Sequence, residues 1–289
     1  GTTAPSQQLE ITKNFQMPNT TNPNKYGIIY KGASPFIHDF NYGDNGTAIT
    51  SGNNTFIGLN AGNLTMGATA TTSAQSSANT IVGSGAFFQN TTGYANSALG
   101  SSALFKNTTG YENVAQGAGA MLNNTTGYYN TANGSNALYK NTTGFYNVAI
   151  GQKAAYENTL GSYNTVLGAR ALGSKTGAGS SNVVIGYQAG TYQADGVTAL
   201  ASATSSIYIG TNARGYNNSD NNSIVIGDSA IGIGANSVVL GNDNILTTLL
   251  KGNVGIGTTT PTSAKLVIGS ATNNYTIDAG TYRIGNIGT

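Results

Sequence analysis

The sequence contains no cysteine and no tryptophan, and its one histidine is His38. The absence of cysteine excludes a disulfide framework and a thiolate metal site, and it leaves the redox compartment open. A lone histidine cannot form a two-histidine metal site, and its surroundings in residues 35–40 match no catalytic triad. We therefore expect His38 to have a structural role in a hairpin, and we expect no metal site, no cofactor and no enzymatic activity.

Charged residues are scarce, because they make up 8% of the 289 residues, against roughly 25% in typical soluble domains. The formal net charge is +2, and the basic residues are scattered singly, so no patch is dense enough to release phosphate counter-ions. No stretch approaches the roughly 18 consecutive apolar residues of a membrane-spanning helix. The composition therefore predicts no nucleic-acid partner and no membrane span, and polarity comes instead from asparagine, threonine and serine.

Proline is missing from residues 36–260, and the five prolines are Pro5, Pro18, Pro23, Pro35 and Pro261. A proline inside a stacked β-ladder removes a hydrogen-bond donor, so its absence is typical of a sheet interior. We therefore expect an N-terminal β attachment or capping region at 1–50, β-solenoid repeats at 51–257, and a C-terminal neck or strand segment at 258–289. Strands in the two flanking parts are expected at 8–15, 26–30, 264–268 and 275–278.

Glycine, in contrast, occurs 41 times, and much of it is periodic with a spacing of 17 residues. Each periodic glycine is the last residue of a phrase such as Asn-Val-Ala-Ile-Gly. A second phrase, Asn-Thr-Thr-Gly followed by an aromatic residue, begins at Asn90, Asn107, Asn124 and Asn141. A unit this small cannot bury a core alone, so neighbouring units must stack. The predicted fold class is all-β, a parallel β-solenoid or β-roll of about twelve short coils. The glycines that close these coils are Gly58, Gly83, Gly100, Gly117, Gly134, Gly151, Gly168, Gly186, Gly210, Gly227, Gly241 and Gly257.

The strand phrase is apolar on both faces. The residue two places before each closing glycine is never charged and never an amide, as at Ala98 and Val166. The residue one place before the glycine is apolar in most coils, and these residues form the candidate trimer interface: Leu99, Ile150, Leu167, Ile185, Ile209, Ile226 and Leu240. The same row carries Gln116 and Asn133, which we expect to form polar layers on a threefold axis. A coil covers only one face with its own return segment, so we expect another copy of the same chain, arranged around a symmetry axis, to cover the other.

Four further groups carry weaker functional signals. The candidate surface aromatic row would stack on sugar rings if exposed and would serve subunit packing if buried: Tyr94, Tyr111, Tyr128 and Phe145. The threonine pairs of the Asn-Thr-Thr-Gly phrases would suit ice binding, although the glycine after each pair marks a corner. A carboxylate pair among Asp220, Asp228 and Asp243 would suit glycan cleavage, although surface turns explain these residues more simply. The Asn-x-Thr sequons, as at Asn90, we interpret as asparagines that bond along the stack rather than carry glycans.

The repeats resemble known fibrous families. The Asn-Val-Ala-Ile-Gly phrase is similar to the head repeats of trimeric autotransporter adhesins, and the Asn-Thr-Thr-Gly-Tyr phrase resembles repeats of secreted bacterial and phage tail-fibre-like proteins. Residues 252–261 resemble the neck that often precedes a self-cleaving intramolecular chaperone domain. The resemblance covers residues 52–261 and implies a trimer of parallel β-rolls.

From these patterns we expect an extracellular structural fibre or filament subunit, or an adhesin, on a bacterial surface. It would act by rigid display and self-association, as a homotrimer with head-to-tail polymerisation through its termini, and a cell-surface glycan or protein receptor would be its partner. The start at Gly1 favours removal of a secretory signal. The alternative is a phage tail fibre or spike, located in the virion, that binds a host glycan. An ice-binding solenoid and a glycan-cleaving tailspike are minor alternatives.

Overall fold

A computed structural model describes residues 19, 21, 27–173 and 179–246, together with the backbone of 254–256 and 266–268. The chain divides into two compact units, Gly1–Asn244 and Ile245–Thr289. The first unit holds a 13-stranded sheet, and the second holds a two-stranded sheet. The described residues contain strands and turns but no helix, so the fold class is all-β, as predicted.

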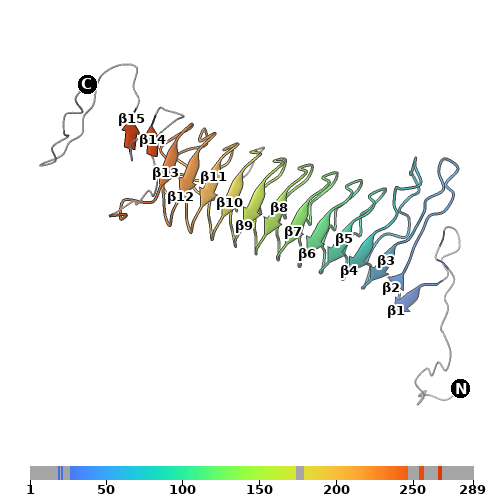
Figure 1. Cartoon of the computed structure of the whole chain (residues 1–289). Coiled ribbons are helices and arrows are strands. Elements are labelled where there is room, and N and C mark those ends of the chain that lie inside the picture. The colour runs from blue at the N-terminus through green and yellow to red at the C-terminus, as the bar shows by residue number, and fades with distance from the viewer. Residues whose placement is uncertain are drawn as a thin grey trace, which may run out of the picture. The chain divides into compact units, whose positions relative to one another are not determined.

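The sheet of the first unit begins with antiparallel strands and continues with parallel ones. Strands β1 (Ile29–Lys31) and β2 (Ser34–His38) form a hairpin, and β2 pairs antiparallel with β3 (Thr55–Ile57). From β3 to β13 each strand pairs in parallel with the next one along the chain (Figure 1). These strands are β4 (Thr80–Val82), β5 (Ser97–Leu99), β6 (Val114–Gln116), β7 (Thr131–Asn133), β8 (Val148–Ile150), β9 (Thr165–Leu167), β10 (Val183–Ile185), β11 (Ile207–Ile209), β12 (Ile224–Ile226) and β13 (Val238–Leu240). Parallel neighbours in chain order make this unit a β-solenoid, which confirms the sequence prediction.

Eleven of the predicted strand phrases form the parallel stack, and the twelfth does not. That last phrase forms β14 (Val254–Ile256), which pairs in parallel with β15 (Leu266–Ile268) in the second unit. The expectation of about twelve stacked coils is therefore too high by one. The strand expected at 26–30 lies slightly later, as β1, and β15 lies within the strand expected at 264–268. The strands expected at 8–15 and 275–278 lie outside the described residues.

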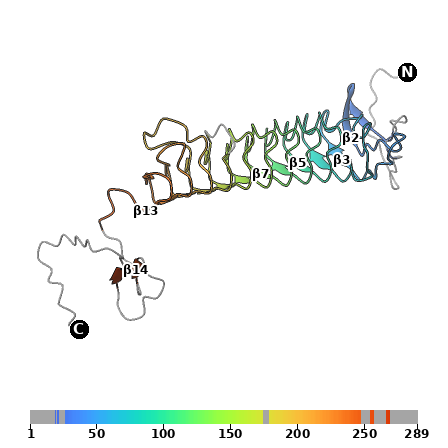
Figure 2. The same cartoon turned by 90° about the horizontal axis from the view of Figure 1, so that it is seen from above.

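A narrow core runs along the stack between the strand of each coil and its return segment, defined as the six residues after the closing glycine. The central strand residue points inward, since Ala115 is fully buried. From the return segment, Ala103 and Leu104 are also fully buried. Successive return segments are joined by backbone hydrogen bonds, such as that from Leu104 N to Ala120 O at 3.0 Å. Figure 2 shows this succession of coils from above.

The closing glycines are required by the close approach of successive coils. Gly100 has a φ of +144°, and a Cβ there would lie 2.5 Å from the carbonyl carbon and oxygen of Gly117. Gly117 is in the same position relative to Gly134, with a distance of 2.6 Å. A side chain at these positions would therefore collide with the backbone of the next coil and would also strain its own backbone.

Candidate functional site

The outward face of the sheet is exposed in the single chain and is largely apolar. In β5 the central Ala98 is 3% exposed while Leu99 beside it is 56% exposed. The predicted interface residues Leu99, Ile150, Leu167 and Leu240 are exposed, and Ile185, Ile209 and Ile226 are half-buried. Strands β3 to β13 contain no charged residue. The sequence thus assigned the inner and outer rows correctly, and the outer row is a candidate interaction surface.

Gln116 and Asn133 lie next to each other on this outward face. They pair directly in the register of β6 and β7, and both side chains are exposed. Their neighbours in the same row are Leu99 on one side and Ile150 on the other. This row therefore carries one polar band of two layers between two apolar stretches, while the other outward row includes Ser97, Thr131 and Thr165.

A ladder of buried asparagines supports the edge of the sheet. Asn113 donates from both its backbone N and its Nδ2 to Asn96 Oδ1, each at 3.1 Å, and its Nδ2 also donates to Gly127 O at 2.9 Å. The same pattern connects the residue just before each strand in eight successive coils: Asn54, Asn79, Asn96, Asn113, Asn130, Asn147, Asn164 and Asn182. Each side chain in this ladder satisfies both a backbone donor and its neighbour, so the ladder holds the coils in register.

The Asn-Thr-Thr-Gly corners form a second ladder. Asn107 Nδ2 donates to Asn90 Oδ1 at 3.1 Å and to Gly110 O at 2.9 Å, and both asparagines are fully buried. The sequon asparagines are therefore structural, as predicted, because an attached glycan needs an exposed amide. In the first threonine row, Thr108 Oγ1 donates to Thr125 O at 3.0 Å. These hydroxyls are engaged within the stack. The second threonine is exposed at Thr109, Thr126 and Thr143, whereas in the first pair Thr91 is exposed and Thr92 is buried.

The candidate aromatic row stacks on itself. Ring centroids lie 4.8 Å apart between Tyr94 and Tyr111, and 4.9 Å apart from Tyr111 to Tyr128 and from Tyr128 to Phe145, with interplanar angles of 2° to 4°. A second row of exposed rings meets the first edge-on, and it consists of Tyr129, Tyr146 and Tyr163. Ring faces inside the first row are covered by neighbouring rings, so they offer edges rather than faces to a sugar.

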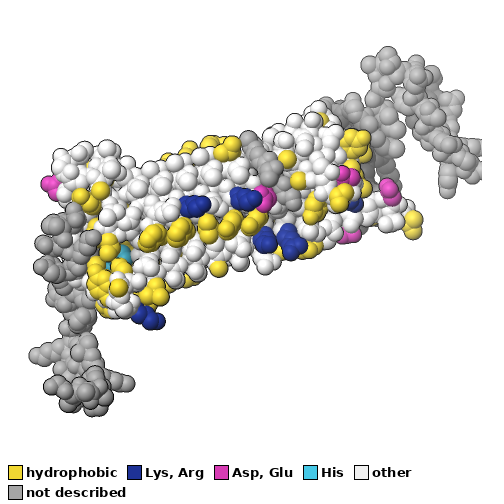
Figure 3. Space-filling model, turned by 180° about the vertical axis from the view of Figure 1, so that it is seen from behind, with side chains coloured by type: hydrophobic (Ala, Val, Ile, Leu, Met, Phe, Trp, Pro, Cys, Tyr) yellow, Lys and Arg dark blue, Asp and Glu magenta, His cyan; other side chains and the backbone are white. Residues whose placement is uncertain are grey.

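The face formed by the return segments, here named the return face, carries a third aromatic row and a set of basic side chains. Its rings are Phe88 and Phe105, stacked at 5.7 Å, and Tyr139 and Tyr156, stacked at 4.9 Å. Seen from behind in Figure 3, basic side chains lie beside an apolar stripe. Among the described residues, the basic ones that line the hollows of this face are Lys106, Lys140, Lys153, Arg170 and Arg214.

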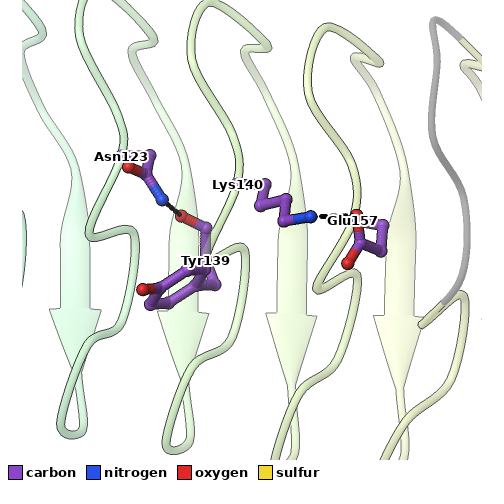
Figure 4. Close-up of polar contacts among 4 residues, drawn as sticks. All are labelled: Asn123, Tyr139, Lys140 and Glu157. Atoms are coloured by element: carbon purple, nitrogen blue, oxygen red, sulfur yellow. Dashed lines mark hydrogen bonds and ion pairs between the residues drawn. The ribbon is translucent and has the colours of Figure 1, made fainter.

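One basic residue of the return face forms an ion pair. Lys140 Nζ lies 2.7 Å from Glu157 Oε2, and this hydrogen bond raises the pKa of Lys140 (Figure 4). In the neighbouring coils, Asn123 Nδ2 donates to Tyr139 O at 2.9 Å. The pair is the sole salt bridge among the described residues. Because the basic residues are scattered along the sequence, the sequence pattern did not predict this face.

His38 is buried and structural in this geometry, as expected. Its Nε2 donates to Ala61 O at 2.8 Å, its Nδ1 accepts from Phe40 N at 3.3 Å, and its ring stacks on Phe56 with a centroid distance of 4.6 Å. Burial lowers the pKa of His38 from its usual value. Both ring nitrogens are occupied by backbone groups, so the imidazole has no free position for proton transfer or metal binding.

The three aspartates considered for catalysis do not form one site. Asp220 is fully buried, and its carboxylate accepts hydrogen bonds from Tyr208 Oη at 3.1 Å, Tyr216 N at 3.1 Å and Ser223 Oγ at 2.6 Å. Asp228 and Asp243 are exposed. The residue that lies next to Asp228 in the following coil is Asn242, whose Nδ2 donates to Asp228 O, so Asp243 occupies a different position in its coil. Within the described ranges no three histidine, cysteine or acidic side chains come together as a metal site.

Comparison of this chain with protein-family models, with curated proteins and with solved structures finds no match. In the described part of the chain, no helix has the length and apolarity needed to cross a membrane. Any functional assignment therefore rests on the two exposed faces described above.

Proposed function

We propose that this protein is an extracellular structural subunit of a fibre or filament, or an adhesin, on a bacterial surface. The observation that carries the proposal is the outward face of the sheet, which is largely apolar, has no charged residue in β3 to β13, and is exposed or half-buried along the parallel stack. Ten strand spacings of about 4.8 Å make this face about 48 Å long. An exposed apolar surface of this length marks an interaction site.

The partner that fits this face best is a second and third copy of the same chain. Every coil presents its outward residue at the same position, so copies related by a rotation axis along the stack would match layer by layer. The absence of charge from the strands removes repulsion between identical faces. In such a trimer Gln116 and Asn133 would form polar layers near the axis, and these layers would fix the register of the chains.

The interior of the stack supports a structural rather than a catalytic role. The ladder asparagines form hydrogen bonds to neighbouring coils, the ring nitrogens of His38 bond to backbone groups, and Asp220 accepts hydrogen bonds from uncharged donors. Rigidity and length are what this arrangement provides. A fibre subunit or adhesin uses these properties to hold a binding surface away from the cell.

Oligomeric mass tests the proposal directly. Native mass measurement should give three chains, and a stable monomer would contradict it. Replacing Leu167→Lys on the sheet face should dissociate the trimer, because it places three charges in an apolar layer. Leu160→Lys is the matched control, since Leu160 is equally exposed but lies at the corner. Dissociation by the control variant alone would overturn the face assignment.

The polar layers give a second test of the same face. Replacing Gln116 and Asn133 with isoleucine should raise the thermal midpoint of the trimer, because polar layers in apolar interfaces fix register at some expense of stability. A fall of several degrees, with the trimer mass unchanged, would place these residues away from the axis.

We also propose that trimers join end to end. Strand β13 is the last strand of the 13-stranded sheet, and β14 pairs with β15 rather than with β13. Unpaired strand edges at the end of a stack favour addition of another strand. Electron microscopy should show filaments for the full chain and short rods after deletion of residues 1–20. Short rods in both preparations would leave a single fibre or adhesin.

The return face favours one second candidate, a phage tail fibre or spike that binds a host glycan. Its combination of hollows, polar side chains and cations suits receptor recognition rather than assembly. Gene neighbourhood separates the two candidates, because tail and baseplate genes beside this one would favour the phage assignment.

A further inference from the structure

A small pocket lies on the return face, on the opposite side of the core from the sheet. It has a volume of about 170 Å³ and is lined by Lys153, Tyr156, Arg170, Gly173, Gln188, Thr191 and Tyr192. Lys153 Nζ lies 5.5 Å from the centre of the Tyr156 ring. Neither Lys153 nor Arg170 forms an ion pair within the described residues. The pocket therefore combines two uncompensated positive charges with amide and hydroxyl groups.

Two further hollows continue the pocket along the same face. A groove of about 420 Å³ is lined by Lys106, Asn123 and Lys140, together with three threonines. It adjoins the pocket through Tyr156, whose ring centre is also 6.0 Å from Lys140 Nζ. On the other side, a hollow of about 270 Å³ shares Gln188 and Tyr192 with the pocket.

That third hollow adds Arg214, whose Nη1 donates to Ala194 O at 3.5 Å and whose Nε is buried without a hydrogen-bond partner among the described residues. Five cations thus follow the face from the coil of Gly100 to that of Gly210, six coils later, a span on the order of 30 Å. The described acidic groups near them are Glu157, which is already paired with Lys140, Asp195 in the loop beside Arg214, and Asp228, whose carboxylate accepts from Ser229 of the third hollow. The face is therefore net positive on an almost uncharged stack.

We propose that the return face binds an acidic polysaccharide and that Lys153 and Arg170 hold one of its carboxylate or sulfate groups. A linear ligand fits because the hollows follow one another along the stack. Guanidinium and ammonium groups form strong charge-assisted hydrogen bonds with such anions. The amide of Gln188 and the hydroxyl of Tyr192 would bond to sugar hydroxyls. This proposal concerns a different face from the proposed trimer interface.

The spacing of the charges favours a polysaccharide over a nucleic acid. Duplex DNA carries one phosphate charge about every 1.7 Å of its axis, and proteins that bind it neutralise many phosphates at once. Five cations over a span on the order of 30 Å are too sparse for that ligand. An acidic glycan, with its charges separated by whole sugar rings, matches the observed distribution.

Binding is tested with defined polymers at about 0.15 M salt, where weak surface electrostatics are screened. The probes are polygalacturonate for carboxylate groups, dextran sulfate for sulfate groups, neutral dextran, and a single-stranded oligonucleotide. We expect the full chain to bind one or both acidic glycans and not dextran. The double variant K153Q/R170Q should weaken this binding at least about tenfold, as expected for the loss of charge-assisted hydrogen bonds.

Lys31→Gln is the matched control, because Lys31 is exposed on β1 and lies outside the return face. It should change the affinity less than about twofold. An equal loss from Lys31→Gln, tighter binding of the oligonucleotide, or no binding of either acidic glycan would overturn the proposal. Native mass measured on the same samples separates the two proposals, because a monomer that binds acidic glycan contradicts only the trimer, and a trimer that binds none contradicts only the glycan site.

Discussion

The coils from β4 to β10 and the coils from β11 to β13 stack in the same parallel register with different buried side chains. In the first group the residue before each strand is asparagine, whose amide serves two coils at once. In the second group this position is Ser206, Ser223 and Ser237. A serine hydroxyl is too short to repeat the amide ladder, and Ser206 Oγ instead donates to Asp220 O at 2.8 Å and accepts from Ser223 N at 3.1 Å.

The cores of the two groups also differ, because a small residue on one side of the core is matched by a large residue on the other. The central strand residue is alanine from β5 to β8, opposite large return residues such as Leu104 and Met121. In β11 it is Tyr208, which is fully buried and lies against Gly190, where a Cβ would be only 3.2 Å from the tyrosine ring. Burial raises the pKa of Tyr208, and its hydroxyl donates to Asp220. One stack thus tolerates two chemistries, as long as each coil fills its core and satisfies its buried polar groups.

The largest expected effect comes from breaking the asparagine ladder. Asn130→Ala removes the acceptor for Asn147 N and Nδ2 and the donor to Gly144 O, so it should destabilise the fold by about 4 kcal/mol. Ser206→Ala removes one donor and one acceptor and should destabilise it by about 2 kcal/mol. Denaturant unfolding of both variants measures the difference, and equal losses would mean that the two groups do not depend on different ladders.

Glycine substitution tests the close approach of coils. Gly134→Ala should cost about 3 kcal/mol, because its Cβ would lie 2.5 Å from Gly151 O and its φ is +141°. Gly234→Ala is the control, since its φ is +119° but no atom lies within 4 Å of the added Cβ. It should cost only the backbone strain, about 1 kcal/mol. Thermal midpoints that fall equally would show that backbone strain, rather than collision, determines the effect.

Asp220 tests whether the second group needs a charge or only an acceptor. Asp220→Ala should cost about 3 kcal/mol, because it leaves Tyr208 Oη and Tyr216 N without their acceptor. Asp220→Asn should stay within about 1 kcal/mol of the wild type. Its oxygen can accept from the tyrosine groups, while its amide donates to Ser223 Oγ, which in turn donates to Gly234 O. A large loss in the asparagine variant, measured by denaturant unfolding, would mean that the charge itself is required.

Acidification should loosen the N-terminal end of the stack. The pKa of His38 is lowered by burial, so the unfolded state binds a proton first as the pH falls below about 6.5. The stabilisation that depends on neutral His38 is therefore complete above that pH and declines below it. Hydrogen exchange near β2 and β3 should accelerate at pH 5 relative to pH 7.5. His38→Gln should remove this pH dependence, and an unchanged dependence in that variant would assign it to other groups.

The smallest expected effect is a gain in stability. Ala95 precedes an asparagine of the first ladder and has a φ of +52°, a conformation that glycine adopts without strain. Ala95→Gly should therefore stabilise the fold by about 0.5 to 1 kcal/mol. Ala98→Gly in β5 is the control, and it should destabilise the fold by about 1 kcal/mol because a strand interior gains nothing from glycine. Destabilisation by Ala95→Gly would indicate that its methyl group contributes to packing.

Much of the architecture could be predicted because a strict repeat reveals its own geometry. The closing glycines located every strand of the stack, and the two rows before them separated core residues such as Ala115 from surface residues such as Leu99. The twelfth phrase looked the same in sequence, yet β14 pairs with β15. The local sequence pattern predicts that a segment forms a strand, but the strand with which it pairs depends on which other strands the rest of the chain places beside it.

The features of the candidate surfaces also fall into two groups, those that the sequence predicts and those that only the tertiary structure reveals. The sequence by itself determined the solenoid, its glycine corners and the outward apolar row, because each depends on positions that recur with a fixed period. Only the tertiary structure decided that Asp220 is a core residue, that the aromatic row covers its own ring faces, and that the return face is basic. Lys106 and Lys153 occupy different positions within their repeats, so the periodicity alone does not align them. They lie on one face because the return segment of each coil turns both positions outward on the same side of the core.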